Sequence, residues 1–219
     1  MSQENRTVRW FYHSIPFIML FLLWEIVARV IHNPYILPPF SAVVASAFSP
    51  SLAYHLGITL AFSLLALLIV SLVGLPVGKL MHRFKEAEWA LSPFFWFLLF
   101  ALALGLGTTG IVPILIMWFG LSQLTVLLFS ILIPLMVVAL ISCYGAKLTA
   151  VRVGFLLCWS LQISMGVYLI SVAGLGTQLS IFYHLHNLEM VYAIMLIMGF
   201  TGLFVDSVLK YMGNKIKER

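Results

Sequence analysis

The stretch LAFSLLALLIVSLVGLPVG, residues 60–78, decides the fold because it contains no charged side chain. About 20 apolar residues in a helix cross the hydrocarbon core of a bilayer. Lipid offers no partner to a backbone amide, so a run of this kind forms a helix rather than a strand. The stretch therefore predicts a membrane-spanning helix, which the neighbouring sequence extends to residues 56–81.

The rest of the chain repeats this pattern, since 63% of its 219 residues are hydrophobic and only 9% are charged. A soluble domain cannot hide so much apolar surface. We therefore expect an all-α membrane protein with a single transmembrane domain over residues 1–219. The six expected helices cover residues 12–31, 56–81, 91–119, 121–142, 151–173 and 190–212.

Lysines and arginines are divided unevenly between the two sides that six helices create. With both termini on one side, that side receives every one of the 12 lysines and arginines except Arg29. Because basic segments stay in the cytoplasm, we expect a multi-pass membrane protein with both termini cytoplasmic. The segments that contain Lys85 and Lys147 then face the cytoplasm.

Polar residues interrupt two of the expected helices. In the third, GLGTTG at residues 105–110 predicts a break, which is tolerated at membrane depth only where the backbone is buried in protein or lines a cavity. In the fifth, the side chains of Ser160, Gln162 and Ser164 need partners away from lipid. Hydrogen bonds between helices and a pore lining are both open interpretations for Gln162.

Small residues and short-range pairs predict packing rather than chemistry. Gly74 and Gly78 are four positions apart, and Gly199 and Gly202 are three apart, so we expect close helix packing at both pairs. Ser41 is expected to cap a short helix through AVVASAF.

Two acidic residues are expected to form ion pairs within their own helices. Glu25 lies four positions before Arg29, and Asp206 four before Lys210. The sequence shows no two neighbouring carboxylates suited to acid–base catalysis, no cluster of histidines and no activated nucleophile. We therefore expect no catalytic activity, no bound metal and no cofactor in this chain.

Five segments resemble, in the same order, the permease subunits of bacterial ABC importers of the sulfonate/nitrate/taurine type. They are LLWEIVARVIHNPYILPPFSAVVASAF (22–48), HLGITLAFSLLALLIVSLVGLPVGKLMHR (55–83), VPILIMWFGLS (112–122), AGLGTQLS (173–180) and IMGFTGLFVDSVLKYMGNKI (197–216). No single segment is decisive, and together they span nearly the whole chain.

The resemblance implies a type I importer permease fold, a place in the bacterial inner membrane and a set of partners. These are a second permease copy or a paralogue, an extracytoplasmic solute-binding protein, and an ATP-binding subunit that holds the ATP. The solute it implies is small and often anionic. The residues we expect along the solute pathway are Thr108, Thr109, Trp118, Ser160, Gln162 and Ser164. Tyr35 and Pro38 are expected at the rim that meets the binding protein.

One departure from this family falls where the ATP-binding subunit would dock. The family has a cytoplasmic loop with an EAA element between the fourth and fifth helices, whereas about seven residues, 144–150, join them here. So short a connection closes a helix hairpin and leaves no room for a docking helix. The remaining candidates for contact with the ATP-binding subunit are Lys85, Glu86, Lys147 and Arg152.

Two hypotheses from different classes follow. The first is a transmembrane subunit of an ABC importer with a divergent contact to its ATP-binding subunit. The second is an accessory or scaffold membrane subunit that kept the permease bundle without ATP-driven transport.

Overall fold

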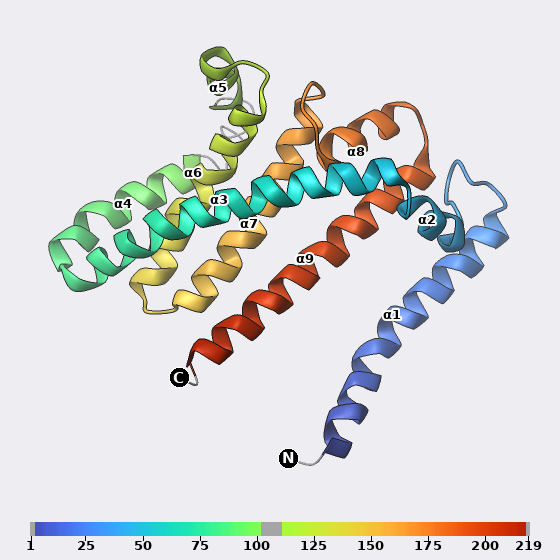
Figure 1. The fold of residues 1–219 in the computed structure, drawn as a ribbon, viewed down its shortest axis with the longest axis horizontal. Coiled ribbons are helices and arrows are strands. Elements are labelled where there is room, and N and C mark those ends of the chain that lie inside the picture. The colour runs from blue at the N-terminus through green and yellow to red at the C-terminus, as the bar shows by residue number, and fades with distance from the viewer. Residues whose placement is uncertain (1–2, 102–110, 218–219) are drawn as a thin grey trace.

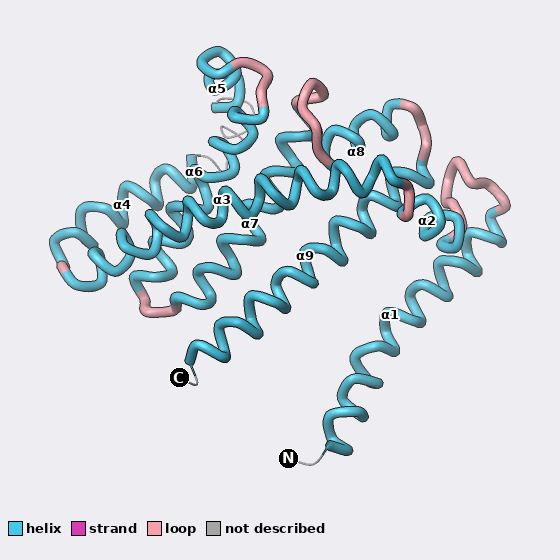
Figure 2. Tube along the Cα trace, in the orientation of Figure 1, coloured by secondary structure: helices cyan, strands magenta, loops and turns pink. Residues whose placement is uncertain are grey.

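A computed structural model describes the backbone of residues 3–101 and 111–217, and the side chains of residues 15–101 and 111–215. Within this part of the chain, every regular element is a helix, and turns and short loops connect them (Figure 2). The expected all-α class is confirmed. The helices are α1 Gln3–Ile31, α2 Phe40–Ala47, α3 Pro50–Arg83, α4 Lys85–Ala101, α5 Val112–Phe119, α6 Gln123–Cys143, α7 Lys147–Tyr168, α8 Leu175–His184 and α9 Leu188–Lys217.

Four helices of the described part are long and apolar enough to cross a membrane, namely α3, α6, α7 and α9. The span expected at 12–31 lies within α1, whose side chains are described only from residue 15 onward. The span expected at 91–119 lies partly outside the described residues, and the break expected at 105–110 lies wholly outside them, so the number six stays a prediction. The span expected at 151–173 is wrong in its extent. Helix α7 begins earlier, at Lys147, and ends at Tyr168, and a separate helix α8 follows.

Two glycines bring α3 close to α6. A Cβ atom added to Gly74 would lie 3.0 Å from Cγ1 of Val138 and 3.2 Å from the carbonyl oxygen of Leu135. A Cβ atom added to Gly78 would clash with the hydroxyl of Ser142 and with the backbone of α6. Small residues allow such close approach of helices in lipid. The packing expected at Gly74 and Gly78 is therefore confirmed.

Helix α7 completes a three-helix core with α3 and α6. A Cβ atom on Gly154 of α7 would lie 2.6 Å from Cγ2 of Val138, the same side chain that packs on Gly74. Val70, Val138 and Phe155 have no exposed surface, and they belong to one cluster that joins the three helices. In Figure 1, α3 runs across this core, with α6 and α7 packed against it.

The turn between α6 and α7 is shorter than the seven residues expected. It consists of Tyr144, Gly145 and Ala146, because α7 already begins at Lys147. Gly145 has a φ of 82°, a conformation that favours glycine. Its N–H donates to the carbonyl of Ser142 at 3.0 Å. The two helices therefore form a tight antiparallel hairpin.

The outer helices are attached through aromatic contacts. Phe21 of α1 stacks on Phe40 of α2 with ring centroids 4.5 Å apart, and it lies 6.4 Å from Phe200 of α9. Figure 1 shows the α6–α7 turn and the C-terminal end of α9 at one end of the bundle, and α2 and α8 at the other.

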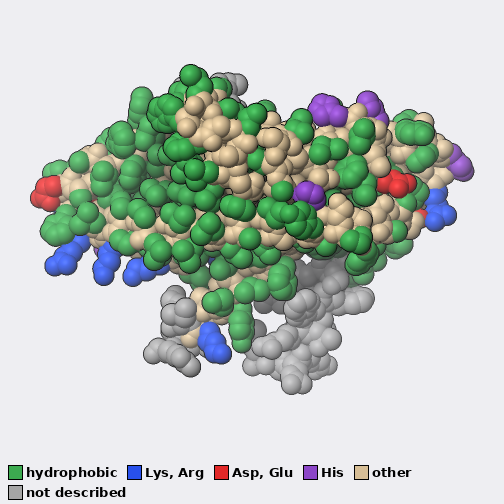
Figure 3. All heavy atoms as spheres, turned by 45° about the horizontal axis from the view of Figure 1, so that its top comes forward, with side chains coloured by type: hydrophobic (Ala, Val, Ile, Leu, Met, Phe, Trp, Pro, Cys, Tyr) green, Lys and Arg blue, Asp and Glu red, His purple; other side chains and the backbone are tan. Residues whose placement is uncertain are grey.

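The surface has the character expected of a protein in a bilayer. In Figure 3, hydrophobic side chains cover much of the visible face, several lysines and arginines lie along its lower left edge, and the histidines lie toward its centre and right. Many large apolar side chains are exposed, among them Met117 at 83% and Leu72 at 67%. This arrangement supports a multi-pass membrane protein.

Replacing Gly78 by valine tests the contact between α3 and α6. The added side chain has no space beside Ser142, and overpacking of this kind costs about 1–3 kcal/mol. We expect a clear fall in melting temperature in detergent. Gly57→Val in the same helix is the control, because nothing lies within 4 Å of the position of its new Cβ atom. An equal fall in both variants would contradict the packing described here.

Candidate functional site

Helix α7 presents two chemically different faces. One face is buried in the core and includes Phe155, Trp159, Gln162 and Met165. The opposite stripe is exposed and consists of Leu156, Ser160, Ser164 and Tyr168, each four positions after the last. Residues four apart lie on one side of a helix, so two hydroxyl groups face away from the core at mid-helix. This stripe is the candidate functional surface.

Gln162 does not belong to the exposed stripe. Its side chain is 4% exposed, and the Ser130 hydroxyl of α6 donates to its Oε1 at 3.0 Å. The same hydroxyl lies 2.8 Å from the carbonyl oxygen of Val126. Of the two interpretations open from the sequence, the hydrogen bond between helices is the one present in this single chain.

Ser160 and Ser164 are both exposed, as a pathway lining requires. The Ser164 hydroxyl donates to the carbonyl of Ser160 at 2.8 Å, a bond within the helix that satisfies it without a partner from elsewhere. The Ser160 hydroxyl lines a groove between α7 and α9. The structure thus brings two of the predicted pathway residues together on one stripe.

An ion pair links α7 to α9 beside this stripe. Arg152 donates from Nε to Oδ1 of Asp206 and from Nη2 to Oδ2, both at 2.7 Å. Planar bidentate contacts of this type are the strongest form of the arginine–carboxylate interaction. The expected pairing of Asp206 with Lys210 is wrong, because Asp206 turns toward α7. Arg152, a candidate contact for an ATP-binding subunit, already has its charge paired inside the chain.

A second polar cluster holds α8 against the start of α3. Nδ1 of His55 accepts a hydrogen bond from the N–H of Gly174 at 3.1 Å, and the Thr59 hydroxyl accepts one from Leu175 at 2.8 Å. These are N–H groups at the beginning of α8, where no bond within the helix is available. The side-chain amide of Gln178 lies 3.0 Å from Nε2 of His55. His55 and Thr59 therefore act as a cap supplied by another helix.

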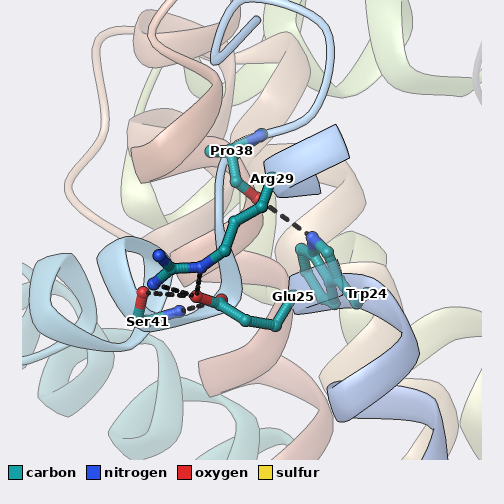
Figure 4. Close-up of polar contacts among 5 residues, drawn as sticks. All are labelled: Trp24, Glu25, Arg29, Pro38 and Ser41. Atoms are coloured by element: carbon teal, nitrogen blue, oxygen red, sulfur yellow. Dashed lines mark hydrogen bonds and ion pairs between the residues drawn. The ribbon is translucent and has the colours of Figure 1, made fainter. Parts of the chain in front are cut away.

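A third cluster joins α1 to α2, as Figure 4 shows. The expected pair of Glu25 and Arg29 is present, with Nε of Arg29 2.8 Å from Oε1. Oε2 of Glu25 also accepts from the backbone N–H of Ser41 at 3.0 Å. A carboxylate is favourable at a helix N-terminus. The expectation that Ser41 caps α2 is wrong: Ser41 lies inside the first turn, and Glu25 satisfies its N–H.

The cluster in Figure 4 also places the two expected rim residues. The indole N–H of Trp24 donates to the carbonyl of Pro38 at 3.0 Å, and Pro38 is a buried residue of the α1–α2 connection. Tyr35 is 79% exposed. Only Tyr35 is therefore available at the rim.

The remaining predicted site residues lie apart from α7's stripe. Trp118 is 72% exposed on α5, and Lys85, Glu86 and Lys147 are exposed at helix ends. Thr108 and Thr109 lie outside the described residues. Among residues 15–101 and 111–215, no group of three His, Cys, Asp or Glu side chains could hold a metal ion.

Two glycines of α9, Gly199 and Gly202, do not both lie at a close helix contact. Nothing lies within 4 Å of a Cβ atom placed on Gly199, so the expectation of close packing is wrong at this position. Gly202 faces the indole of Trp159, whose Nε1 would be 3.6 Å from an added Cβ atom. Space is therefore left over α9 beside the exposed stripe of α7.

Sequence reasoning missed contacts between residues far apart in the chain. Arg152 and Asp206 are 54 positions apart, and His55 and Gly174 are 119 apart. No local spacing rule connects them. The sequence did contain one signal for the ion pair: Arg152 and Asp206 are opposite charges in different apolar segments, and unpaired charges are costly in lipid.

Comparison with known proteins gives two informative relatives. The chain is 27% identical over 237 aligned positions to a putative ABC transporter permease protein of Methanocaldococcus jannaschii, covering 89% of this chain and 86% of the relative. It is 34% identical over 109 positions to the formylaminopyrimidine transport permease protein ThiX of Halalkalibacterium halodurans, covering 48% of this chain and 42% of that protein. No family model matches the chain, and no solved structure matches it.

The names of these relatives and the apolar helices support a multi-pass membrane protein and an ABC transporter permease subunit. They indicate a transport subunit rather than an enzyme, and they imply an ATP-binding subunit as a partner. The first alignment extends over more positions than this chain has residues, so the archaeal relative carries residues without a counterpart here.

Removing the Asp206 carboxylate tests the ion pair. In Asp206→Ala, Arg152 loses both charge-assisted hydrogen bonds, which we expect to cost about 2 kcal/mol of stability. The measurement is thermal unfolding of the purified protein in detergent. Lys210→Ala is the control and should change little. If Lys210→Ala were as destabilising as Asp206→Ala, Asp206 would pair with Lys210 instead.

Proposed function

We propose that this chain is a transmembrane subunit of an ABC importer in the cytoplasmic membrane, with both termini in the cytoplasm. It acts with a second transmembrane chain, a copy or a paralogue, and takes its solute from an extracytoplasmic binding protein. The observation that carries the proposal is the similarity to an ABC transporter permease over 89% of the chain. Hydrolysis of ATP belongs to a separate subunit.

The exposed stripe of α7 supports a route between two transmembrane chains. Hydroxyl groups at Ser160 and Ser164 would face lipid if the chain acted alone, and polar side chains at membrane depth usually face a partner or a cavity. A second chain placed against this stripe would enclose them. Gln162 then stabilises the wall of the route from within the bundle through Ser130.

The contact with the ATP-binding subunit must differ from that of the family with the EAA loop. The turn of α6 and α7 has three residues, so it can touch a partner without inserting a helix into it. Lys147 at this turn and Lys85 at the start of α4 are both exposed cations. We propose that they meet acidic groups of the ATP-binding subunit. Coupling then depends on contacts that change between the two states of the transporter.

The solute of the proposed importer is small. The resemblance seen in the sequence implies an anion, whereas one relative is named for transport of a formylaminopyrimidine, which places uncharged compounds among the candidates.

Affinity purification from native membranes tests this function. We expect an ATP-binding subunit to accompany the tagged chain and the complex to hydrolyse ATP. Reversing the charge of both cations, Lys85→Glu with Lys147→Glu, should reduce the recovered ATP-binding subunit several-fold. Leu185→Glu, at an exposed position of the opposite end, is the control.

Recovery of the chain without any ATP-binding subunit would contradict the proposal and favour the accessory or scaffold hypothesis. Equal recovery of the ATP-binding subunit with the double variant and with the control would be compatible with an importer. It would show that Lys85 and Lys147 do not contribute to the contact.

A further inference from the structure

A groove of about 510 Å³ lies between α7 and α9 beside the exposed stripe. Trp159 and Ser160 contribute to it from α7, and Gly199, Gly202 and Asp206 contribute from α9. Its other lining residues are aliphatic side chains and a methionine. Small-molecule sites commonly have this size and this mixture of apolar walls with a few polar groups.

The groove exists because α9 carries glycine where a side chain would fill it. A Cβ atom on Gly199 would meet nothing within 4 Å, and one on Gly202 would meet only the edge of the Trp159 indole. At these two positions α9 therefore presents no side chain to fill the space beside Trp159, and Arg152 and Asp206 join the two helices nearby.

Trp159 brings to the groove an indole N–H with no acceptor among the described residues. Among those residues, the fully buried side-chain atoms without a partner are the hydroxyls of Ser63 and Ser71, so this N–H reaches the surface of the groove. The side chain is 5% exposed, and its ring is fixed by stacking with Phe155 at a centroid distance of 6.1 Å. Its Nε1 edge faces Gly202. Within residues 15–101 and 111–215, Trp24 donates its indole N–H to Pro38, but Trp159 has no comparable partner.

At membrane depth no water is present to accept from this N–H. It therefore gains a hydrogen bond only from a partner that brings an acceptor into the groove. Acyl chains carry no acceptor at this depth, and the backbone carbonyls of a neighbouring helix are already bonded within that helix. A small molecule that carries a hydrogen-bond acceptor can accept from the Trp159 indole N–H, whereas acyl chains and a neighbouring helix cannot.

The charges of the groove select against ions. The described residues that line it include no lysine, arginine or histidine, and the one carboxylate, Asp206, is neutralised by Arg152. A bound anion would therefore lie among apolar side chains without a free counter-charge, which is strongly unfavourable. The Ser160 hydroxyl can still accept or donate a hydrogen bond.

We propose that this groove binds a small uncharged aromatic amide, whose carbonyl accepts from Trp159 Nε1 and whose amide N–H donates to the Ser160 hydroxyl. The aromatic ring lies over Gly199 and Gly202, between the apolar walls. The inference rests on the proposed transport function, since it names the class of solute that would pass along α7, and it replaces the anion implied by the sequence resemblance.

Equilibrium binding to the purified chain, with its accompanying subunits in lipid nanodiscs, tests the inference. The probes are nicotinamide and benzenesulfonate, which share a six-membered ring and differ in charge. We expect saturable binding of nicotinamide and at least tenfold weaker binding of benzenesulfonate. Trp159→Phe keeps the ring and removes the donor, so it should weaken nicotinamide binding about tenfold, the value of one hydrogen bond.

Two further variants distinguish loss of binding at the groove from loss of the folded structure. Gly199→Leu should abolish binding by filling the groove, while Trp96→Phe, which alters an exposed indole on α4, should leave binding unchanged. Melting temperatures show whether each variant is folded. The inference is overturned if nicotinamide does not bind, if benzenesulfonate binds equally well, or if folded Trp159→Phe binds as the parent does. Recovery of the ATP-binding subunit is a separate readout, so the transport proposal survives any of these results.

Discussion

The close contact between α3 and α6 is the constraint on which the rest of the structure depends. Gly74 and Gly78 let the backbone of α3 lie against Val138 and Ser142, and Gly154 lets α7 share the same valine. Lipid provides no hydrophobic drive for helices to associate, so backbone proximity and a few internal polar contacts determine how they pack. The three-residue turn then fixes α7 antiparallel to α6. With three helices fixed in this way, only one stripe of α7 remains uncovered.

In this arrangement the polar residues of α7 have different roles. Gln162 and Ser130 hold α6 and α7 together, and Arg152 ties α7 to α9 through Asp206. Ser160 and Ser164 face away from these contacts. At the opposite end, His55 and Thr59 satisfy the first amides of α8. Each buried polar group of these clusters has a partner in another helix. Among the described residues, the buried hydroxyls of Ser63 and Ser71 on α3 have none, and the stripe of α7 exposes two hydroxyl groups beside a groove.

The sequence predicted what depends on local pattern. Apolar run length indicated the all-α class, and glycine spacing indicated the packing at Gly74 and Gly78. It failed where two apolar segments meet: Asp206 could be assigned to Lys210 by helical spacing, but its partner Arg152 comes from another helix. The same limit explains Gln162, whose environment depends on the neighbouring position of Ser130. The short connection of α6 and α7 was visible in the sequence because it needs no tertiary information.

Cysteine labelling in native membranes tests most directly whether the stripe of α7 lines a route for solute. Cys143 and Cys158, both buried, are first replaced by alanine. A cysteine is then placed at Ser160, or at Phe204, which is 68% exposed on α9. The account predicts that a small, uncharged, water-soluble thiol reagent modifies the cysteine at position 160 and spares the one at 204. Absence of labelling at 160, or equal labelling at both positions, would contradict it.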